Sequence, residues 1–457
     1  MAHDPVPALL KRPIEALEEE FARLPDAGPA YGASEDMAAM GQILEETAHR
    51  LGDNYPYFHP LYAGQMLKPP HPVARAAYAL AMKINPNNHA RDGGRASSEM
   101  EIEAVQAIAK MFGWENSTYL GHLTSSGTIA NLEALWVCRE LAPGKRILGS
   151  EQAHYTHSRM SGVLKLNYTP IETDYRGRMR LDALETELAK GGVGAVVVTV
   201  GTTGIGAVDP LVEILALRTR YGFRVHVDAA YGGYFGLIAK DLDEPARLAY
   251  AVIGQADSIV IDPHKHGLQP YGCGCVLFRD PAVGRFYKHD SPYTYFTSKQ
   301  LHLGEISLEC SRAGAAAVAL WATQQLLPLV PEGEFAGGLR RGRTAALELD
   351  RRLREDRQFE PLAGGGPELD IVVWKMKAET LQQASERAHR VFDGCAARQL
   401  HLALVQLPHS WFLPGGGASN NAEMVTCLRS VLMKPEHEAW LGRIWERLSA
   451  ACAESEE

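Results

Sequence analysis

The sequence lacks an apolar segment long enough to cross a membrane, and it has no excess of positive charge. Its formal net charge is -9 at pH 7, whereas nucleic-acid binding favours basic surfaces. The first residues, MAHDPVPALLKRP, lack the apolar stretch of a secretion signal. We therefore expect neither a membrane nor a nucleic acid as a partner, and we predict a cytoplasmic location.

Cysteine is scarce, with seven residues in the chain, and the spacing of these residues does not suggest paired metal ligands. Cys273 and Cys275 lie close together in a strand-like segment, where we interpret them as small core residues rather than as a redox or metal site. The sequence therefore predicts no metal centre and no disulfide framework, which agrees with a reducing compartment.

Internal repeats and low-complexity tracts are also missing, and 457 residues are too many for one ordinary core. We predict a helical N-terminal segment over residues 1–60, a large domain over 61–330 and a smaller α+β domain over 331–457. The second boundary follows a change of composition at residues 328–338, PLVPEGEFAGG.

Between about residues 100 and 280, helical patterns alternate with short apolar runs. The runs RILGS, VGAVVVTVG, RVHVD and DSIVID are apolar almost throughout, which indicates strands buried on both faces of a sheet. The sequence therefore predicts an α/β fold with a mainly parallel sheet covered by helices on both sides. The next run, CGCVLFRD, follows after a short loop and could pair antiparallel.

Polar residues occur where several of these predicted strands end. Asp228 ends VHVD, Lys265 follows IVID, and Thr203 follows VVVTVG; His154 follows RILGS. In open α/β sheets, ligands bind outside the carboxyl ends of the strands. The turn TSSGT immediately before a helix offers backbone N–H groups and hydroxyls to an anion at the positive end of the helix dipole.

A phosphate cradle, a buried carboxylate and an isolated lysine together suit pyridoxal phosphate. Its aldehyde needs the amine of Lys265 to form a Schiff base, and its pyridine nitrogen needs a carboxylate such as Asp228 to stay protonated. His154 could stack on the ring. Taken singly, Asp228 is more often a turn or cap residue, Lys265 a solvated charge and TSSGT an ordinary helix cap; the combination favours the cofactor.

The sequence resembles the pyridoxal-phosphate-dependent group II amino-acid decarboxylases, which include the aromatic-L-amino-acid, glutamate and archaeal tyrosine/aspartate decarboxylases. The resemblance spans roughly residues 50 to 320. It is carried by the segments FHPLYAGQM, TSSGTIANLEAL, SEQAHYTHSR, VTVGTTGIGAVDP, HVDAAYGG, DPHKHG and ECSRAGAAA.

The resemblance implies fold type I, the aspartate-aminotransferase-like architecture, in an obligate homodimer whose active sites lie at the interface. Residues 61–330 would then be the pyridoxal-phosphate-binding domain. The resemblance makes Lys265 the Schiff-base lysine, Asp228 the partner of the pyridine nitrogen and His154 the stacking histidine. The remaining implied cofactor contacts are Ser126, Gly127 and Thr128 at the phosphate, Thr203 and Ala230 along the ring, and His264 beside the lysine.

We predict α-decarboxylation of an L-amino acid, aromatic and tyrosine-like, with aspartate or glutamate as the alternative. Tyr293 and Tyr295 are candidates to protonate the product carbanion, or are packing aromatics. The predicted substrate contacts are His59, Tyr62, Gln65 and Arg312. Arg312 could instead form an ion pair, and the aromatic residues near position 59 could simply pack at the entrance of the domain.

Two alternatives to this predicted function stay open. A carbon–carbon lyase of the sphingosine-phosphate lyase type would use the same cofactor on a phosphorylated amino alcohol. A metal-dependent hydrolase would instead use His154-x-x-His157 and Asp262-x-His264-x-His266 as ligands, but it leaves Lys265 and the TSSGT turn unexplained.

Overall fold

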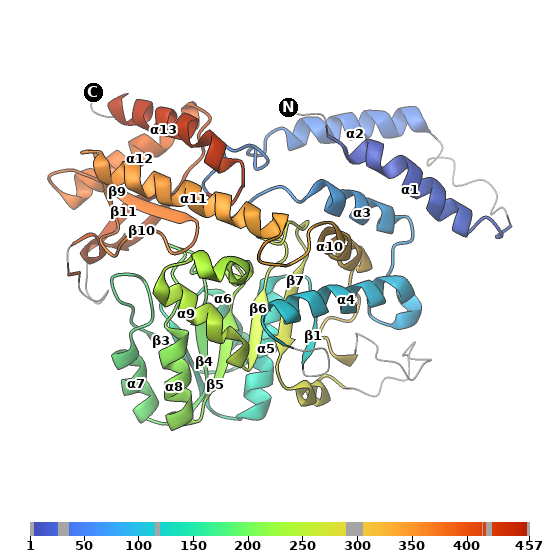
Figure 1. Cartoon of the computed structure of the whole chain (residues 1–457), viewed down its shortest axis with the longest axis horizontal. Coiled ribbons are helices and arrows are strands. Elements are labelled where there is room, and N and C mark those ends of the chain that lie inside the picture. Colours follow the sequence, from blue (N-terminus) through green and yellow to red (C-terminus); the bar gives the residue numbers. More distant parts are fainter. Residues whose placement is uncertain are drawn as a thin grey trace.

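The computed structural model describes residues 4–25, 36–114, 119–288, 305–413, 415–416 and 423–454. Within these residues the chain forms two sheets with helices packed against them (Figure 1). None of the described helices is both long and apolar enough to cross a membrane. The two sheets come from separate stretches of the chain, and the strands of the larger sheet come first in the sequence.

Seven of the described strands form the larger sheet, in the order β1-β7-β6-β5-β4-β2-β3. They are β1 (Leu120–Thr124), β2 (Arg146–Ser150), β3 (Tyr168–Ile171), β4 (Val193–Thr199), β5 (Arg224–Asp228), β6 (Ser258–Ile261) and β7 (Gly274–Phe278). β7 pairs antiparallel with β1 and β6, and all other pairs are parallel. The mainly parallel sheet and the antiparallel pairing of CGCVLF are confirmed, whereas β1 and β3 were not predicted.

Helices cover both faces of this sheet, and the side chains of β4 show how. Ala195 and Val197 pack toward α5 (Gly127–Leu141) and α6 (Thr156–Val163). Val196 and Val198 belong to the opposite core, with the helices α4 (Arg95–Met111), α7 (Leu181–Ala189), α8 (Leu211–Tyr221), α9 (Glu244–Val252) and α10 (Gly314–Leu326). Since successive side chains of a strand point to opposite faces, a strand covered on both sides must be apolar throughout.

The smaller sheet is antiparallel and has the order β10-β11-β9-β8. Its strands are β8 (Phe359–Pro361), β9 (Ile371–Met376), β10 (Ala403–Pro408) and β11 (Met424–Val431), and its helices are α11 (Glu334–Glu355), α12 (Leu381–Ala397) and α13 (His437–Glu454). Trp374 packs under these helices, whereas Ile371 and Val373 on the opposite face join the core of the larger sheet. The predicted boundary near residue 330 stays a prediction, because this core continues across it.

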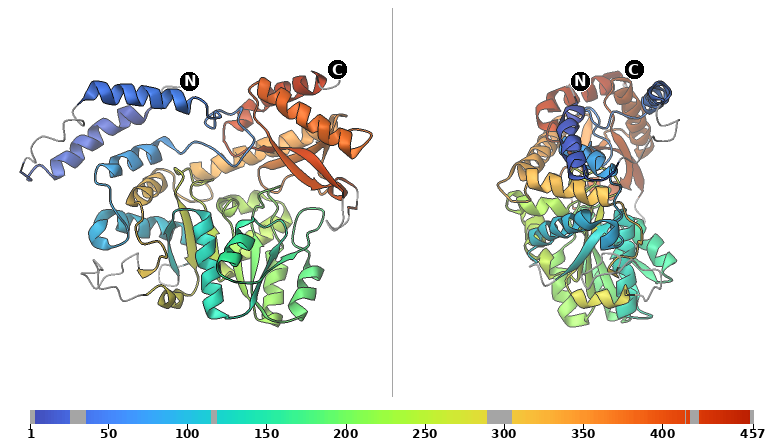
Figure 2. Two further views of the ribbon diagram at one scale, coloured as in Figure 1. Left: turned by 180° about the vertical axis from the view of Figure 1, so that it is seen from behind. Right: turned by 90° about the vertical axis from the view of Figure 1, so that its right-hand side faces the viewer.

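The N-terminal helices lie apart from both sheets. α1 (Val6–Glu20) packs against α3 (Pro72–Met82), and α3 packs against α10. α2 (Met37–Leu51) has no buried residue. Figures 1 and 2 show α1 and α2 extending away from the body of the molecule. The two helices confirm the helical prediction for this segment, and residues 54–64 contain neither helix nor strand, as predicted.

Candidate active site

A cavity of about 190 Å³ lies at the carboxyl ends of the parallel strands β4, β5 and β6. The structure brings nine residues of the predicted cofactor site together around it, namely Ser126, Gly127, Thr128, His154, Thr203, Asp228, Ala230, His264 and Lys265. These residues come from five separate segments of the chain, and the strand order places those segments at one edge of the sheet.

Lys265 lies in the turn that follows β6. Its Nζ is 3.0 Å from Oδ2 of Asp262, and its side chain is 21% exposed, so the amine is reachable from the cavity that it lines. The neighbouring His264 donates from Nδ1 to the carbonyl oxygen of Cys273 at 2.7 Å, and burial lowers its pKa. The turn is therefore held by its own hydrogen bonds and presents a lysine whose position is fixed.

Asp228 ends β5 and is buried, and three groups donate to its carboxylate. His157 Nε2 lies 2.7 Å from Oδ2, Asn131 Nδ2 donates to the same oxygen at 3.4 Å, and the backbone N–H of Ala230 donates to Oδ1 at 3.1 Å. Burial alone would raise the pKa of Asp228, but the His157 hydrogen bond and the charges of His157 and Lys265 hold that pKa below its ordinary value. The carboxylate is therefore ionised at neutral pH.

His154 lies in the loop between β2 and α6. Its Nδ1 accepts the backbone N–H of Thr156 at 3.2 Å and lies 2.5 Å from Oγ1 of the same residue. A neutral imidazole that accepts at Nδ1 carries its proton on Nε2. Burial lowers the pKa of His154, so at neutral pH the ring lining the cavity is uncharged and offers an Nε2–H donor.

The N-terminus of α5 closes another side of the cavity. Ser126 caps the helix by accepting the N–H of Ile129 at 3.3 Å. Gly127 follows, and a Cβ at this position would lie 2.5 Å from Oδ1 of Asp262. The absence of a side chain thus lets the helix terminus approach the turn after β6, where its N–H groups and dipole favour an anion.

These residues fit pyridoxal phosphate. One cavity offers an amine at Lys265, an ionised buried carboxylate at Asp228 and a helix N-terminus for the phosphate. The buried hydroxyl of Thr199, which lines the same cavity, has no hydrogen-bond partner among the described residues. Such an unpartnered polar atom agrees with a site built for a polar ligand.

The predicted substrate residues do not line this cavity. The ring of His59 packs edge-on against Trp440 at 4.8 Å between centroids. Tyr62 packs against Tyr57 at 4.7 Å, and exposed Gln65 accepts from Arg429 Nη1 at 3.0 Å. Their roles toward the substrate stay predictions.

Arg312 is engaged elsewhere, in the ion pair that the sequence left open. Its Nη1 lies 2.7 Å from Oε1 of Glu101, and both side chains are almost completely buried. Its substrate role stays a prediction as well. Tyr293 and Tyr295 lie outside the described residues.

Three groups near the site were not assigned from the sequence as parts of it. His157 had been weighed only as a metal ligand, yet it contacts Asp228; Asn131 contacts the same carboxylate from α5. Arg429 in β11 is 4% exposed, and its Nε and Nη2 have no hydrogen-bond partner among the described residues. A strand pattern cannot reveal such an arginine, because alternation predicts only which side of the sheet it occupies.

The histidines of the hydrolase alternative are committed to other partners. His157 pairs with Asp228, and His266 Nε2 lies 3.4 Å from Oδ2 of Asp370. The described part of the chain contains no group of three or more histidine, cysteine or acidic side chains placed to hold a metal ion. Cys273 and Cys275 are buried free thiols whose pKa values burial raises, which confirms them as core residues.

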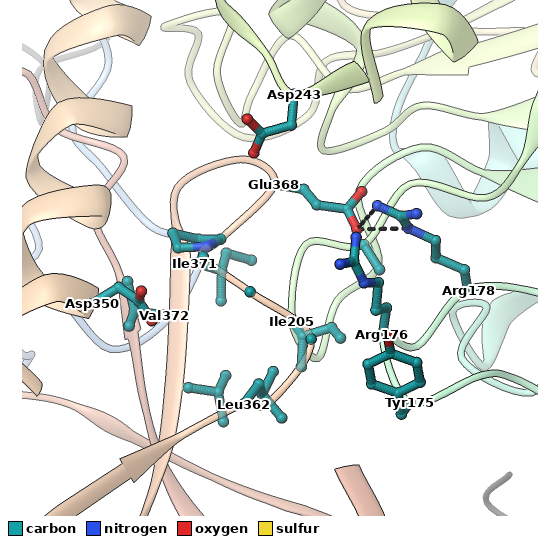
Figure 3. Close-up of a pocket in the computed structure, with 16 residues that line it drawn as sticks. Tyr175, Arg176, Arg178, Ile205, Asp243, Asp350, Leu362, Glu368, Ile371 and Val372 are labelled. Atoms are coloured by element: carbon teal, nitrogen blue, oxygen red, sulfur yellow. Dashed lines mark hydrogen bonds and ion pairs between the residues drawn. The ribbon is translucent and has the colours of Figure 1, made fainter. Parts of the chain in front are cut away.

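A larger cavity of about 300 Å³ lies elsewhere, between the two sheets (Figure 3). Its polar wall contains Glu368, which accepts from Arg178 at 2.6 Å and from the N–H of Val208 at 3.0 Å. Ile205 and Ile371 supply apolar wall. None of the predicted site residues lines it, so the smaller cavity is the candidate active site.

Comparison with known proteins agrees with this choice. Residues 42–377 match the pyridoxal-dependent decarboxylase conserved domain. The chain belongs to this family. It is therefore a pyridoxal-phosphate-dependent amino-acid decarboxylase, and the family resemblance, the fold class and the cofactor predicted from the sequence are confirmed. The lyase and hydrolase alternatives lose their support.

Curated relatives of this decarboxylase differ in substrate. An L-tyrosine decarboxylase of Enterococcus faecium is 28% identical and covers 80% of this chain and 77% of its own. A probable L-tyrosine/L-aspartate decarboxylase of Methanothermobacter thermautotrophicus is 28% identical over 71% of this chain and 85% of its own. An aspartate 1-decarboxylase of Aliivibrio fischeri is 27% identical over 67% and 62%.

Solved structures share the fold of the decarboxylase. Oryza sativa TDC with PLP and tryptamine superposes with a TM-score of 0.76 and 18% identity, covering 99% of this chain and 95% of that one. Mouse CSAD in apo form gives 0.76 and 21%, covering 96% and 91%. The larger sheet and the C-terminal antiparallel sheet therefore form a fold already seen in structures of this kind.

Proposed function

We propose that the enzyme removes the α-carboxylate of an aromatic L-amino acid, L-tyrosine first, and releases the amine and carbon dioxide. The observation that carries this proposal is an aromatic path, a series of neighbouring rings formed by Tyr271, Tyr57 and Tyr62, that leads away from the cofactor cavity. The ring of Tyr271 packs on His264 at 4.8 Å, and His264 lines the cavity. Burial raises the pKa of Tyr271, with smaller contributions from Asp262 and Tyr57, and Tyr57 packs on Tyr62. An aromatic side chain would find matching surfaces along this path.

When bound, pyridoxal phosphate supplies an aldehyde for amines and a ring that accepts the electrons of the breaking bond. Lys265 Nζ, which lines the cavity, would hold the aldehyde. Asp228, held ionised by its donors, would keep a proton on the pyridine nitrogen. His154 would contact the ring and offer its Nε2–H as a hydrogen-bond donor to the substrate carboxylate.

An acidic substrate such as aspartate is the second candidate, and one feature favours it. Among the residues that the structure describes, none bonds to Nε or Nη2 of Arg429, and its Nη1 donates to Oε1 of Gln65. Burial lowers the pKa of Arg429, and Tyr231, which lines the cofactor cavity, raises it. A buried guanidinium with free donors near the cavity could bind a second carboxylate.

We also propose that the enzyme is a homodimer. α2 buries none of its side chains within one chain, and the exposed fractions of Ile43 and Leu44 are both 66%. Phe21, which follows α1 as its C-cap, and Leu51 of α2 are also exposed. A second copy of the chain would cover this apolar surface, which isolated monomers rarely display.

The test is to incubate the holoenzyme with L-tyrosine, L-phenylalanine, L-tryptophan, L-aspartate and L-glutamate and to measure amine and carbon dioxide. We expect the largest kcat/KM for L-tyrosine and no product from the Lys265→Ala variant. Borohydride reduction followed by peptide mass spectrometry should find the cofactor on Lys265. A larger kcat/KM for L-aspartate that is lost in Arg429→Met would replace the aromatic proposal with the acidic one.

A further inference from the structure

Asp228 is the end point of a buried chain of hydrogen bonds that extends beyond the cavity. His157 is 0% exposed, lies 2.7 Å from Oδ2 and does not itself line the cavity. Asn131 reaches the same oxygen from α5. Asn131 also lines the cavity, whereas His157 does not. His157 could therefore not act on the substrate directly, and any effect that it has must pass through Asp228.

The direction of donation along this chain of hydrogen bonds follows from its other members, His226 and Ser258. His226 Nε2 lies 2.8 Å from Oδ1 of Asn131, and His226 Nδ1 lies 2.8 Å from Oγ of Ser258. Burial first, and then the charge of His157, lowers the pKa of His226 to about 3, so this ring is neutral. An amide oxygen only accepts, so His226 Nε2 carries the proton, and Ser258 donates to Nδ1.

With its oxygen held by His226, Asn131 must turn its NH₂ group to Asp228. The reversed amide would place an oxygen against the carboxylate, and two acceptors repel each other. Ser258, His226 and Asn131 therefore donate in sequence toward one carboxylate oxygen. His157 supplies the remaining and shorter donor to that oxygen, at 2.7 Å compared with 3.4 Å.

We propose that His157 is a positioning residue that keeps Asp228 ionised and fixes the plane of its carboxylate toward the cofactor ring. The proposal rests on the role proposed for Asp228. His157 lies at the second position of α6, three residues after His154, so one short segment both lines the cofactor cavity and supports the carboxylate from behind. Removing the donor raises the pKa of Asp228, and the ring nitrogen then loses its counter-charge at a higher pH.

The experiment compares His157→Phe, which fills the space but donates nothing, with His157→Gln, which restores a donor. Each holoenzyme is desalted across a pH series, and the retained pyridoxal phosphate and the pH profile of kcat are measured. Each profile has an acid limb, in which cofactor retention or kcat falls as the pH decreases. For His157→Phe we expect both acid limbs to move up by about one pH unit, which corresponds to a tenfold change in the ratio of ionised to protonated Asp228 at a given pH. We expect kcat to fall about tenfold or more while KM changes little, and His157→Gln to recover most of both.

His122→Phe is the matched control. His122 is also fully buried and lies 2.8 Å from a carboxylate, that of Glu133, but neither residue lines the cavity. This variant should lose stability and keep the acid limbs of the wild type. If His157→Phe folds and keeps those limbs, the proposal is overturned.

Two further variants keep the test decisive. If His157→Phe does not fold, Asn131→Ala removes the weaker donor and should move the limbs in the same direction by less; unmoved limbs would overturn the hydrogen-bond chain. Asp228→Asn separates the two levels of the argument. If it retains cofactor and activity as the wild type does, the role of Asp228 fails; if only it is impaired and His157→Phe is not, the positioning role alone fails.

Discussion

Three buried aspartates show how neighbours decide the charge of a residue in the same protein. Burial raises the pKa of Asp209 to about 7, although the backbone N–H groups of Thr199 and Met179 donate to its carboxylate and lower that pKa. Burial likewise raises the pKa of Asp370 to about 6, although Tyr231 donates to it. Only at Asp228 do a histidine donor and a lysine charge outweigh burial. Of these three acids, the one that faces the cofactor cavity is therefore the one whose pKa lies below its ordinary value.

Also at the scale of single residues, the Arg312→Met variant distinguishes two roles of Arg312, a structural ion pair and a substrate contact. The substitution leaves Glu101 buried with only the N–H of Leu123 and the amide of Asn88 as donors. We expect the free energy of unfolding to fall by about 3 kcal/mol and KM to stay within about twofold of the wild type, measured by urea denaturation and steady-state kinetics.

The double variant Glu101→Gln/Arg312→Met is its control, because it removes both charges and should recover part of the lost stability. A large rise in KM without loss of stability would instead assign Arg312 to the substrate.

Among the structural elements, α5 depends most on a single position. Gly127→Ala would place a Cβ 2.5 Å from the Asp262 carboxylate, which in turn contacts Lys265. We expect the affinity for pyridoxal phosphate to fall at least about tenfold and the free energy of unfolding to fall by about 1–3 kcal/mol. Equilibrium binding to the apoenzyme and thermal denaturation measure the two effects.

Gly442→Ala in α13 is the matched substitution, since this exposed helical glycine has no atom within 4 Å of an added Cβ. It should stabilise the protein by about 0.5–1 kcal/mol. Equal cofactor affinity in both variants would contradict the close approach of α5 to the turn after β6.

The elements differ in how far the sequence predicts them. β4, β5 and β6 are buried on both faces, so their apolar runs are plain in the sequence. β1 carries Gly121 and His122, and β3 carries Pro170, so neither has such a run. Motif residues at strand ends predict the cavity, because a parallel sheet gathers those ends at one edge. His157 was not predicted beside Asp228, because contacts between residues 71 positions apart depend on how α6 packs.

On the scale of the whole molecule, one core joins the two sheets. Val198 of β4 and Val373 of β9 belong to the same buried cluster, so the predicted domains over 61–330 and 331–457 share part of one core. The N-terminal helices behave differently, since their apolar side chains have little to pack against within one chain. The proposed second subunit would supply that surface.

The paired substitution of Ile43 and Leu44 by aspartate tests the proposed dimer. Two charges on this face would have to be desolvated in the interface, so we expect the variant to sediment as a monomer while the wild type sediments as a dimer. Leu248→Asp is the control, placed on an exposed apolar residue of α9, and it should stay dimeric. A wild-type monomer, or a double variant that stays dimeric, would reject α2 as the contact surface.

The aromatic path beyond His264 lies outside the cavity that holds the amine and the carboxylate. Its tyrosines come from the irregular segment 54–64 and from the loop between β6 and β7, neither of which supplies Asp228 or the N-terminus of α5. The second loop also carries His264 and Lys265, which line the cofactor cavity. Substitutions of the tyrosines themselves could change which amino acid is accepted without loosening the cofactor. Substrate preference could therefore change during evolution while the cofactor site is retained. This agrees with the similar proteins, which include an L-tyrosine decarboxylase and an aspartate 1-decarboxylase.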